Sequence, residues 1–497
     1  MRVGELFGRA GIPCPENAEN IEISNIVTDS RRVTKNSLFI CIKGLSSDGH
    51  EYIDSAVKNG AVVIVAESVR DACVGGAAAL IMLDNTRKVA ALLYNAFYGE
   101  PVKKLKIIGI TGTNGKTSTA TLLYEIFRSA GYRTGLLGTV CRLSADGVVL
   151  LPSGDEKRAN MTTPDPDELY RDLAEMAKDG VEYVFMEISS HALSLHKVDG
   201  IEFDCALFTN LTRDHLDFHG TMEEYYKAKR KLFEKSRRAL INVGGEYGKR
   251  LALECPCPFF TCSVTEGDFY ALDVKSRGLS GVSYIHKSSS GELPIETPIC
   301  GSVGVENTLM AVALARMYGI DQDVIQQTVR QVHGAAGRME KVDIDTDEFS
   351  VIIDYAHTPD ALERLLLCVR DMREENGRIS LVFGCGGERD RGKRRLMGAI
   401  ASRLSDRVTV TSDNSRGEDP CQIILDILKG IDKEKAYSVV PDRREAIERA
   451  VLEARAKDII VLAGKGHEKY EINADGKHPF DETEIVQEAL AKRREQK

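Results

Sequence analysis

The stretch Gly112-Thr113-Asn114-Gly115-Lys116-Thr117 decides how this chain is interpreted. It follows an apolar run over residues 105–110 and precedes residues 118–123, which are predicted to form a helix. A buried strand, a glycine-rich turn and a helix N-terminus bind phosphate together, because backbone N–H groups and the helix dipole converge there. The lysine would add a positive charge, and the threonine an oxygen ligand for Mg²⁺. Ile110 stands where the general pattern has glycine, yet the order of strand, turn and helix still predicts a nucleoside triphosphate site.

Size and charge describe an acidic protein of about three domains. The chain has 497 residues, a net charge of −9 and a sequence pI of about 5.7. This charge argues against nucleic acid as a partner, because nucleic-acid binding relies on a basic face. No apolar run approaches the length of a membrane span, and the first residues lack the apolar core of a signal peptide. We therefore expect a cytoplasmic protein that binds neither nucleic acid nor membranes.

Predicted strands and helices alternate along the chain. Strands are expected over residues 61–66, 183–188, 204–209, 239–242, 351–354, 380–383, 408–411 and 459–462. Such alternation indicates the α/β class with doubly wound, parallel sheets. We predict a small N-terminal α/β domain (1–101), a central P-loop domain with a mostly parallel sheet (102–336) and a C-terminal Rossmann-like domain (337–497). Within the central domain we expect an antiparallel extension over 258–300 and a helix over 307–318.

Polar clusters follow several predicted strands, at the edge where open α/β sheets place their ligands. Glu187 ends one strand, and a carboxylate beside a phosphate loop suits Mg²⁺, which prefers hard oxygen ligands. Asp354 ends another, where it could hold a ribose hydroxyl or only cap a helix. Segments that contain glycine and side chains of both charges follow three predicted strands, beginning near Gly384, Ser412 and Ala463. Three such segments at one edge of a sheet suggest a zwitterionic ligand.

The loop over residues 210–219 allows a second interpretation. It contains His215 and His219, separated by one helical turn, together with two aspartates. Such a pair could bind zinc and serve a metal-dependent hydrolase. No third ligand set stands out, so we prefer a loop that faces the metal of a bound nucleotide. A zinc hydrolase remains the alternative from another class.

Together these motifs resemble those of the Mur ligase family of peptidoglycan synthesis, over essentially the whole chain. The family-specific matches are residues 111–118, 210–219 and 354–357, and Asp413-Asn414-Ser415-Arg416 is similar to the DNPR signature of diaminopimelate-adding members. The resemblance implies an ADP-forming acid–amino-acid ligase that adds meso-2,6-diaminopimelate to UDP-N-acetylmuramoyl-L-alanyl-D-glutamate. ATP would phosphorylate the glutamyl carboxylate, and the amine would attack the resulting acyl phosphate. This step of cell-wall synthesis serves cell shape and division.

The resemblance also implies domains that bind UDP-sugar, ATP and amino acid, in that order, with Mg²⁺ as cofactor. We expect a monomer whose partners are its small-molecule substrates.

The resemblance assigns roles position by position. Catalytic roles fall to Lys116, His215 and Lys229. The expected metal ligands are Thr117, Glu187, His215 and Lys229 as a carbamate. The expected ATP contacts are Gly112, Thr113, Asn114, Gly115, Lys116, Thr117, Ser118, Asn307, Arg338 and Asp354. The uridine nucleotide and muramoyl dipeptide would contact Ser30, Thr162, Thr163, Ser189 and Lys197. Diaminopimelate would contact Arg389, Asp413, Asn414, Ser415, Arg416, Gly464 and Glu468.

Two points stay open in the sequence. It does not select Lys229 over Lys227 or Lys231 as the carbamate, because all three lie on one basic segment. Ser415 replaces the proline of the signature and loosens the turn that orients Arg416. A lysine-adding or folylpolyglutamate-type ligase, which would share the same phosphate loop, is the alternative within the class, although the Asp413–Arg416 signature argues against both.

Overall fold

The N-terminal unit is built on a parallel sheet of four strands, in the order β1-β2-β3-β4. The computed structural model describes residues 1–44, 47–68, 77–150, 161–346 and 348–496. The elements of this unit are α1 (Val3–Arg9), β1 (Asn25–Val27), β2 (Ser37–Ile40), α2 (Ile53–Lys58), β3 (Ala61–Ala66), β4 (Ala79–Met82) and α3 (Thr86–Phe97). The strands are almost wholly apolar, as is typical of a parallel sheet with covered faces.

The central unit contains a sheet of ten strands, in the order β14-β13-β12-β11-β10-β9-β5-β8-β6-β7. Its first half comprises β5 (Lys106–Thr111), α4 (Lys116–Ser129), β6 (Thr134–Leu137), β7 (Arg142–Leu143), α6 (Pro166–Lys178), β8 (Tyr183–Glu187), α7 (Ser190–Ser194) and β9 (Cys205–Phe208). Its second half comprises α8 (Leu216–His219), α9 (Met222–Arg230), β10 (Ala239–Asn242), α10 (Glu246–Glu254), β11 (Phe259–Cys262), β12 (Phe269–Ser276), β13 (Val282–Ser288), β14 (Gly291–Thr297), α11 (Gly301–Met317) and α12 (Gln322–Gln331). Strand β5 pairs in parallel with β8 on one side and β9 on the other. Its carboxyl end therefore lies at the edge where open α/β sheets place their ligands.

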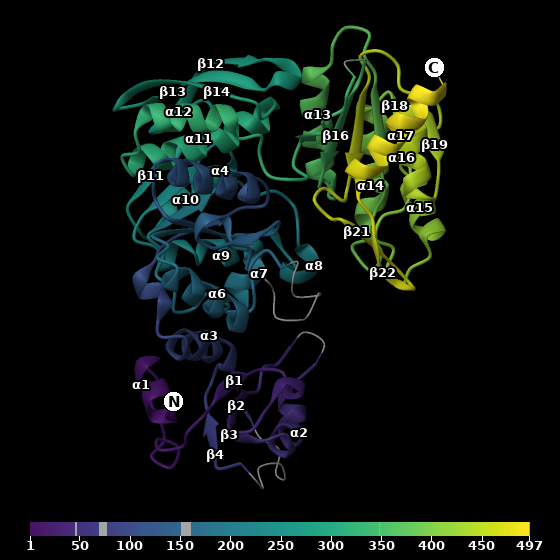
Figure 1. The fold of residues 1–497 in the computed structure, drawn as a ribbon. Coiled ribbons are helices and arrows are strands. Elements are labelled where there is room, and N and C mark those ends of the chain that lie inside the picture. The colour runs from purple at the N-terminus through teal and green to yellow at the C-terminus, as the bar shows by residue number, and fades with distance from the viewer. Residues whose placement is uncertain (45–46, 69–76, 151–160, 347, 497) are drawn as a thin grey trace.

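The C-terminal unit contains six strands in the order β15-β16-β20-β17-β18-β19, all parallel except β15. Its elements are β15 (Glu340–Lys341), β16 (Ser350–Asp354), α13 (Pro359–Met372), β17 (Ile379–Phe383), α14 (Gly392–Leu404), β18 (Arg407–Val410), α15 (Pro420–Leu428), β19 (Ala436–Val439), α16 (Arg443–Leu452), β20 (Ile459–Ala463) and α17 (Glu482–Gln496). A separate hairpin is formed by β21 (Tyr470–Asn473) and β22 (Gly476–Pro479). Figure 1 shows the three units in sequence, with α13 on the side of the C-terminal unit that faces the central one.

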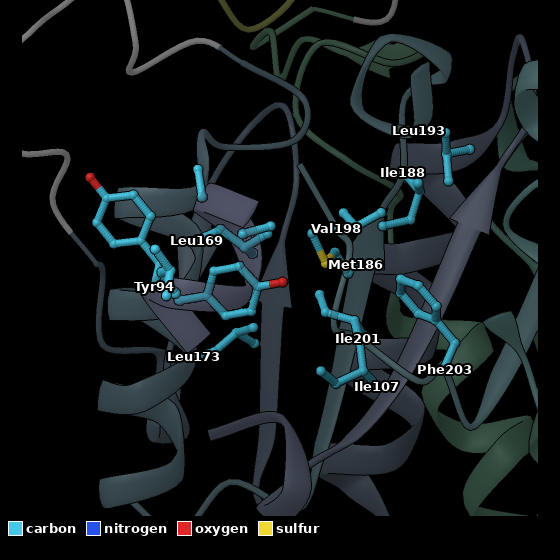
Figure 2. Close-up of a cluster of buried hydrophobic side chains, with 14 of the residues drawn as sticks. Tyr94, Ile107, Leu169, Leu173, Met186, Ile188, Leu193, Val198, Ile201 and Phe203 are labelled. Atoms are coloured by element: carbon cyan, nitrogen blue, oxygen red, sulfur yellow. The ribbon is translucent and has the colours of Figure 1, made fainter. Parts of the chain in front are cut away.

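One apolar cluster joins the first two units. It contains Tyr94 of α3, Leu169 and Leu173 of α6, and residues of the central strands such as Ile107 and Met186. In Figure 2 the side chains of α3 and α6 lie beside those of the central sheet. An ion pair between Arg32 and Asp167, 2.7 Å long, links the same units at the surface. The N-terminal unit thus rests on α6 through a continuous core.

The predicted α/β class and the three successive sheets are confirmed. The antiparallel extension begins at β12, because β11 pairs in parallel with β10 and belongs to the main sheet. The helix expected at 307–318 was placed too late, since α11 begins at Gly301. Gly301 and Gly304 have low helix propensity and concealed its first two turns in the sequence.

Candidate functional site

The phosphate loop leaves β5 at Thr111 and enters α4 at Lys116. Two of its glycines are required by the space available. A Cβ on Gly112 would lie 1.8 Å from Thr209 Oγ1, and one on Gly115, where φ is 83°, would lie 2.5 Å from Asn307 Oδ1. At these two positions the loop passes too close to the residue after β9 and to α11 for a side chain to be added. Ser118 lies in the first turn of α4.

Lys116 folds back over this loop. Its Nζ donates to the carbonyl oxygens of Gly112 at 3.0 Å and Thr113 at 2.9 Å. Burial lowers the pKa of Lys116 from its ordinary value, and the nearby Arg338 acts in the same direction. The lysine is thus held inside the turn that a phosphate group would enter.

Glu187 lies at the carboxyl end of β8 and is almost completely buried. Its oxygens accept hydrogen bonds from Thr117 Oγ1 at 3.0 Å, Thr139 N at 2.9 Å and Thr139 Oγ1 at 3.1 Å. These hydroxyl and backbone N–H donors are all neutral. Gly138 leaves room for the carboxylate, since a Cβ there would lie 2.3 Å from Glu187 Oε1. A buried carboxylate with neutral partners beside a phosphate loop is suited to a hard cation.

Lys229 lies on α9 and only 2% of its surface is exposed. Its Nζ donates to Gly112 O at 2.8 Å and lies 4.8 Å from the ring centroid of Tyr225. Burial lowers the pKa of Lys229 well below its ordinary value, and the charge of Lys116 lowers it further. Lys227, by contrast, is exposed and pairs with Glu224 at 2.9 Å. Tertiary structure thus separates Lys229 from its neighbours on the helix.

His215 is the N-cap of the short helix α8 and adopts a positive φ of 51°. Its ring centroid lies 4.9 Å from that of His191, which lies 5.6 Å from that of His219. Burial lowers the pKa of His215, so its ring is neutral near pH 7 and retains a lone pair. Across the described ranges, no group of three or more His, Cys, Asp or Glu side chains is arranged to hold a metal ion.

Three further residues predicted to contact ATP are Asn307 in the central unit and Arg338 and Asp354 in the C-terminal unit. Asn307 is buried, and its Nδ2 has no hydrogen-bond partner among the described residues. The Arg338 guanidinium lies 4.7 Å from the ring centroid of Tyr355. Asp354 accepts from the backbone N–H groups of Met339 at 2.7 Å and Ala356 at 2.8 Å, so it joins the segment before β15 to the loop after β16 and does not cap α13. Burial raises the pKa of Asp354.

The residues predicted to contact the muramoyl dipeptide divide between two places. Ser189 N donates to Thr163 Oγ1 at 3.0 Å, and the Thr163 hydroxyl donates to the carbonyl of Glu187 at 2.9 Å. Thr162 joins the same network, since its hydroxyl accepts from Thr139 at 3.0 Å. Lys197 pairs with Asp165 at 2.8 Å beside this group. Ser30 lies apart from them in the N-terminal unit, where its backbone oxygen accepts from Asn59.

Most residues predicted to bind diaminopimelate gather at the carboxyl edge of the C-terminal sheet. Asn414 Nδ2 donates to Glu468 at 2.7 Å, and a Cβ on Gly464 would lie 2.9 Å from Asp413 Oδ2. Arg416 adopts a positive φ of 52° and donates through Nη1 to Gly387 O at 2.9 Å. Ser415 is buried between these residues, whereas Arg389 is exposed at the rim.

One residue of this cluster escaped the sequence prediction. Lys465 is fully buried and donates to Asn414 Oδ1 at 3.0 Å and Tyr470 O at 2.9 Å. Burial opposes ionisation of Asp413, but Lys465 and Arg443 outweigh it, so the pKa of Asp413 is lowered. The sequence signal was a lysine between two glycines at a strand end, which alone does not distinguish a buried cation from a solvated one.

Comparisons with known proteins match the three units in turn. Residues 22–98 match the Mur ligase family catalytic domain, 110–315 the Mur ligase middle domain, and 337–466 the Mur ligase glutamate ligase domain. A protein of Clostridioides difficile, called UDP-N-acetylmuramoyl-L-alanyl-D-glutamate–2,6-diaminopimelate ligase, is 44% identical over 99% of this chain and 100% of its own length. A protein of the same name from Syntrophomonas wolfei is 41% identical over 99% of both chains. A solved structure with that name aligns with a TM-score of 0.69 at 32% identity, covering 99% of this chain and 100% of its own.

The fold and these matches define an ATP-dependent, amide-bond-forming ligase. The chain belongs to the Mur ligase family. The resemblance inferred from residues 111–118 and 354–357 is thereby confirmed, and it displaces the zinc-hydrolase interpretation. As to membranes, the helices of the described ranges are all too short or too polar to span a bilayer.

Proposed function

We propose that the chain joins meso-2,6-diaminopimelate to UDP-N-acetylmuramoyl-L-alanyl-D-glutamate, with ATP as co-substrate, in peptidoglycan synthesis. One observation carries the proposal: a phosphate loop and a buried cluster of charged side chains around Asp413 occur in a chain 44% identical to a relative named for that activity, over 99% of this chain. The Arg416 guanidinium and the Glu468 carboxylate supply both signs of charge for a zwitterion. The proposed binding domains are 1–101 for UDP-sugar, 102–336 for ATP and 337–497 for the amino acid.

The reaction needs ATP because a carboxylate is a poor electrophile. Transfer of the γ-phosphoryl group breaks its bond to ADP and forms an acyl phosphate on the glutamyl carboxylate. The diaminopimelate amine then attacks the acyl carbon, loses a proton, and expels phosphate as the amide forms. Lys116 and the N-terminus of α4 stabilise the negative charge that develops on the transferred group.

The donors around Glu187 fit Mg²⁺. Glu187 and Thr117 offer hard oxygens, and the ring of His215, which is exposed to the charges of Lys116 and Lys229, offers a nitrogen. Bound there, Mg²⁺ would neutralise charge on the phosphates. Lys229 supplies a further oxygen pair if its amine combines with CO₂ and releases a proton to form a carbamate. A neutral amine is required for that addition, and burial favours the neutral form of Lys229. The carbamate nitrogen keeps one hydrogen, so the bond to Gly112 O can persist.

Substrate dependence tests the proposal. Purified protein with Mg²⁺ and ATP is expected to release phosphate only when the muramoyl dipeptide and diaminopimelate are both present. Product mass should equal the sum of the two substrates less one water. Equal turnover of lysine would contradict the choice of amino acid, while phosphate release independent of both acceptors would contradict the ligase activity itself.

Arg416→Ala tests the amino-acid pocket. The KM for diaminopimelate should rise about 10–100-fold, because a charge-assisted hydrogen bond to the distal carboxylate is lost. The KM for ATP should change little, since Arg416 follows β18 of the C-terminal sheet, whereas the phosphate loop follows β5 of the central sheet. Steady-state kinetics with each substrate varied separately give this comparison. Arg444→Ala, which removes an exposed arginine paired with Glu488, is the control. Equal increases in both KM values would refute the role of Arg416.

We infer a monomeric, cytoplasmic enzyme whose partners are its small-molecule substrates. Size-exclusion chromatography with light scattering tests the monomer, for which 54.7 kDa is expected.

A further inference from the structure

Asp360 connects the C-terminal unit to the phosphate loop of the central unit. It lies in the first turn of α13, but its carboxylate points to residues far away in the chain. Oδ2 accepts from Asn114 Nδ2 at 3.0 Å and from Thr212 Oγ1 at 3.0 Å. Arg364, one turn further along α13, pairs with the same oxygen at 3.2 Å. One carboxylate oxygen thus joins two loops of the ATP-binding unit to a helix of the next unit.

The two loops that Asp360 contacts are themselves tied together. Thr113 Oγ1 accepts from Thr212 N at 3.0 Å and donates to Thr212 O at 3.2 Å. Asn210 Oδ1 accepts from Asn114 N at 3.0 Å. Several hydrogen bonds therefore join the phosphate loop to the start of the 210–219 loop, and Asp360 contacts both.

A first-turn acid often serves its own helix, through capping or the helix dipole. Capping does not explain Asp360, because Thr358 is the N-cap of α13 and accepts from Ala361 N. The same helix also packs on the central unit farther along. A Cβ on Gly301, at the start of α11, would lie 1.6 Å from Cys368 Sγ. Helix α13 thus contacts the central unit at Asp360 and again two turns later.

We propose that Asp360 is a positioning residue, which sets the phosphate loop in register with the nucleotide contacts of the C-terminal unit. Arg338 and Asp354 lie in the C-terminal unit, whereas Gly112 and Lys116 lie in the central one. A nucleotide that spans both sides is bound more tightly when the two sides are already aligned, because less ordering remains to be done on binding. The inference rests on the proposed ATP site. It predicts an effect on nucleotide affinity rather than on the chemical step.

Asp360→Ala should raise the KM for ATP about tenfold, because a loss of that size is expected when hydrogen bonds to a carboxylate are removed. The kcat at saturating ATP and the KM for diaminopimelate should stay near wild type. Asp360→Asn keeps an oxygen acceptor, so its KM for ATP should lie between those of wild type and Asp360→Ala. Glu363→Ala is the matched control, since Glu363 lies on the same helix and pairs with Arg403 of its own unit. A parallel fall in kcat with unchanged KM for ATP would overturn the assignment.

A double-mutant cycle with Thr212→Val isolates the contact itself. This change removes only the side-chain hydroxyl, while the backbone bonds to Thr113 remain. If the two residues act through one hydrogen bond, the double variant should lose little more ATP affinity than Asp360→Ala alone. Losses that multiply would show that they act independently, and would refute the proposal. Should Asp360→Ala fail to fold, Thr212→Val and Asp360→Asn complete the cycle.

Hydrogen exchange of the ligand-free protein separates this inference from the proposed function. Peptides that cover residues 109–118 and 210–219 should exchange faster in Asp360→Ala than in wild type or Glu363→Ala. Faster exchange in a protein without ligase activity would sustain the contact and reject the function. Unchanged exchange in an active enzyme would reject the contact alone.

Discussion

Lys229→Ala is expected to lower kcat about 10²–10³-fold, the range seen when a group that stabilises transition-state charge is removed. The loss has two sources in the structure. Lys229 Nζ holds Gly112 O at the start of the phosphate loop, and its proposed carbamate supplies oxygens for the metal. Alanine offers neither. Small carboxylates such as acetate or formate should restore part of the rate, because they can occupy the space that the side chain leaves.

Lys227→Ala provides the control for this experiment. It removes a lysine from the same helix, but one that is exposed and paired with Glu224. Its activity should match wild type, with or without added carboxylate. In bicarbonate the intact wild-type protein should also gain about 44 mass units per chain, the mass of one CO₂. Lys229→Ala should show no such gain. Wild-type turnover by Lys229→Ala would remove the carbamate from the mechanism.

Lys116→Met is expected to reduce kcat/KM for ATP by a similar factor, about 10²–10³-fold. Methionine keeps much of the side-chain length but removes the charge that faces the incoming phosphates. It also leaves the carbonyls of Gly112 and Thr113 without their donor inside the turn. Both kcat and nucleotide affinity should fall, because the lysine contacts phosphate in the ground state and in the transition state. Isothermal titration with a non-hydrolysable ATP analogue and steady-state kinetics measure the two effects separately.

Lys103→Met serves as the matched change outside the site. Lys103 is exposed and pairs with Glu100 just before β5, so its replacement should leave both kcat and nucleotide affinity unaltered. Retention of wild-type nucleotide affinity by Lys116→Met would place the triphosphate elsewhere and contradict the site proposed here.

Features that depend on neighbours in the chain were predictable. An apolar run, two glycines and a helix-forming segment encode β5, the phosphate loop and α4, because their order alone creates the anion site. Regular alternation of strands and helices predicted the α/β class for the same reason. The start of α11 was missed because local propensity at Gly301 and Gly304 opposed a helix that packing stabilises.

Contacts between distant segments were not predictable from one sequence. Nothing local distinguishes Lys229 from Lys227, yet only the former is buried against Gly112. Lys465 has the sequence context of a surface turn, but it neutralises Asp413 in the core. The nature of each side chain, and so the chemistry available to it, is set by the sequence. Its burial, pKa and partners depend on which strands and helices come together, because water is excluded where segments distant in the chain pack against one another. Gly112 and Lys229, for example, are 117 residues apart.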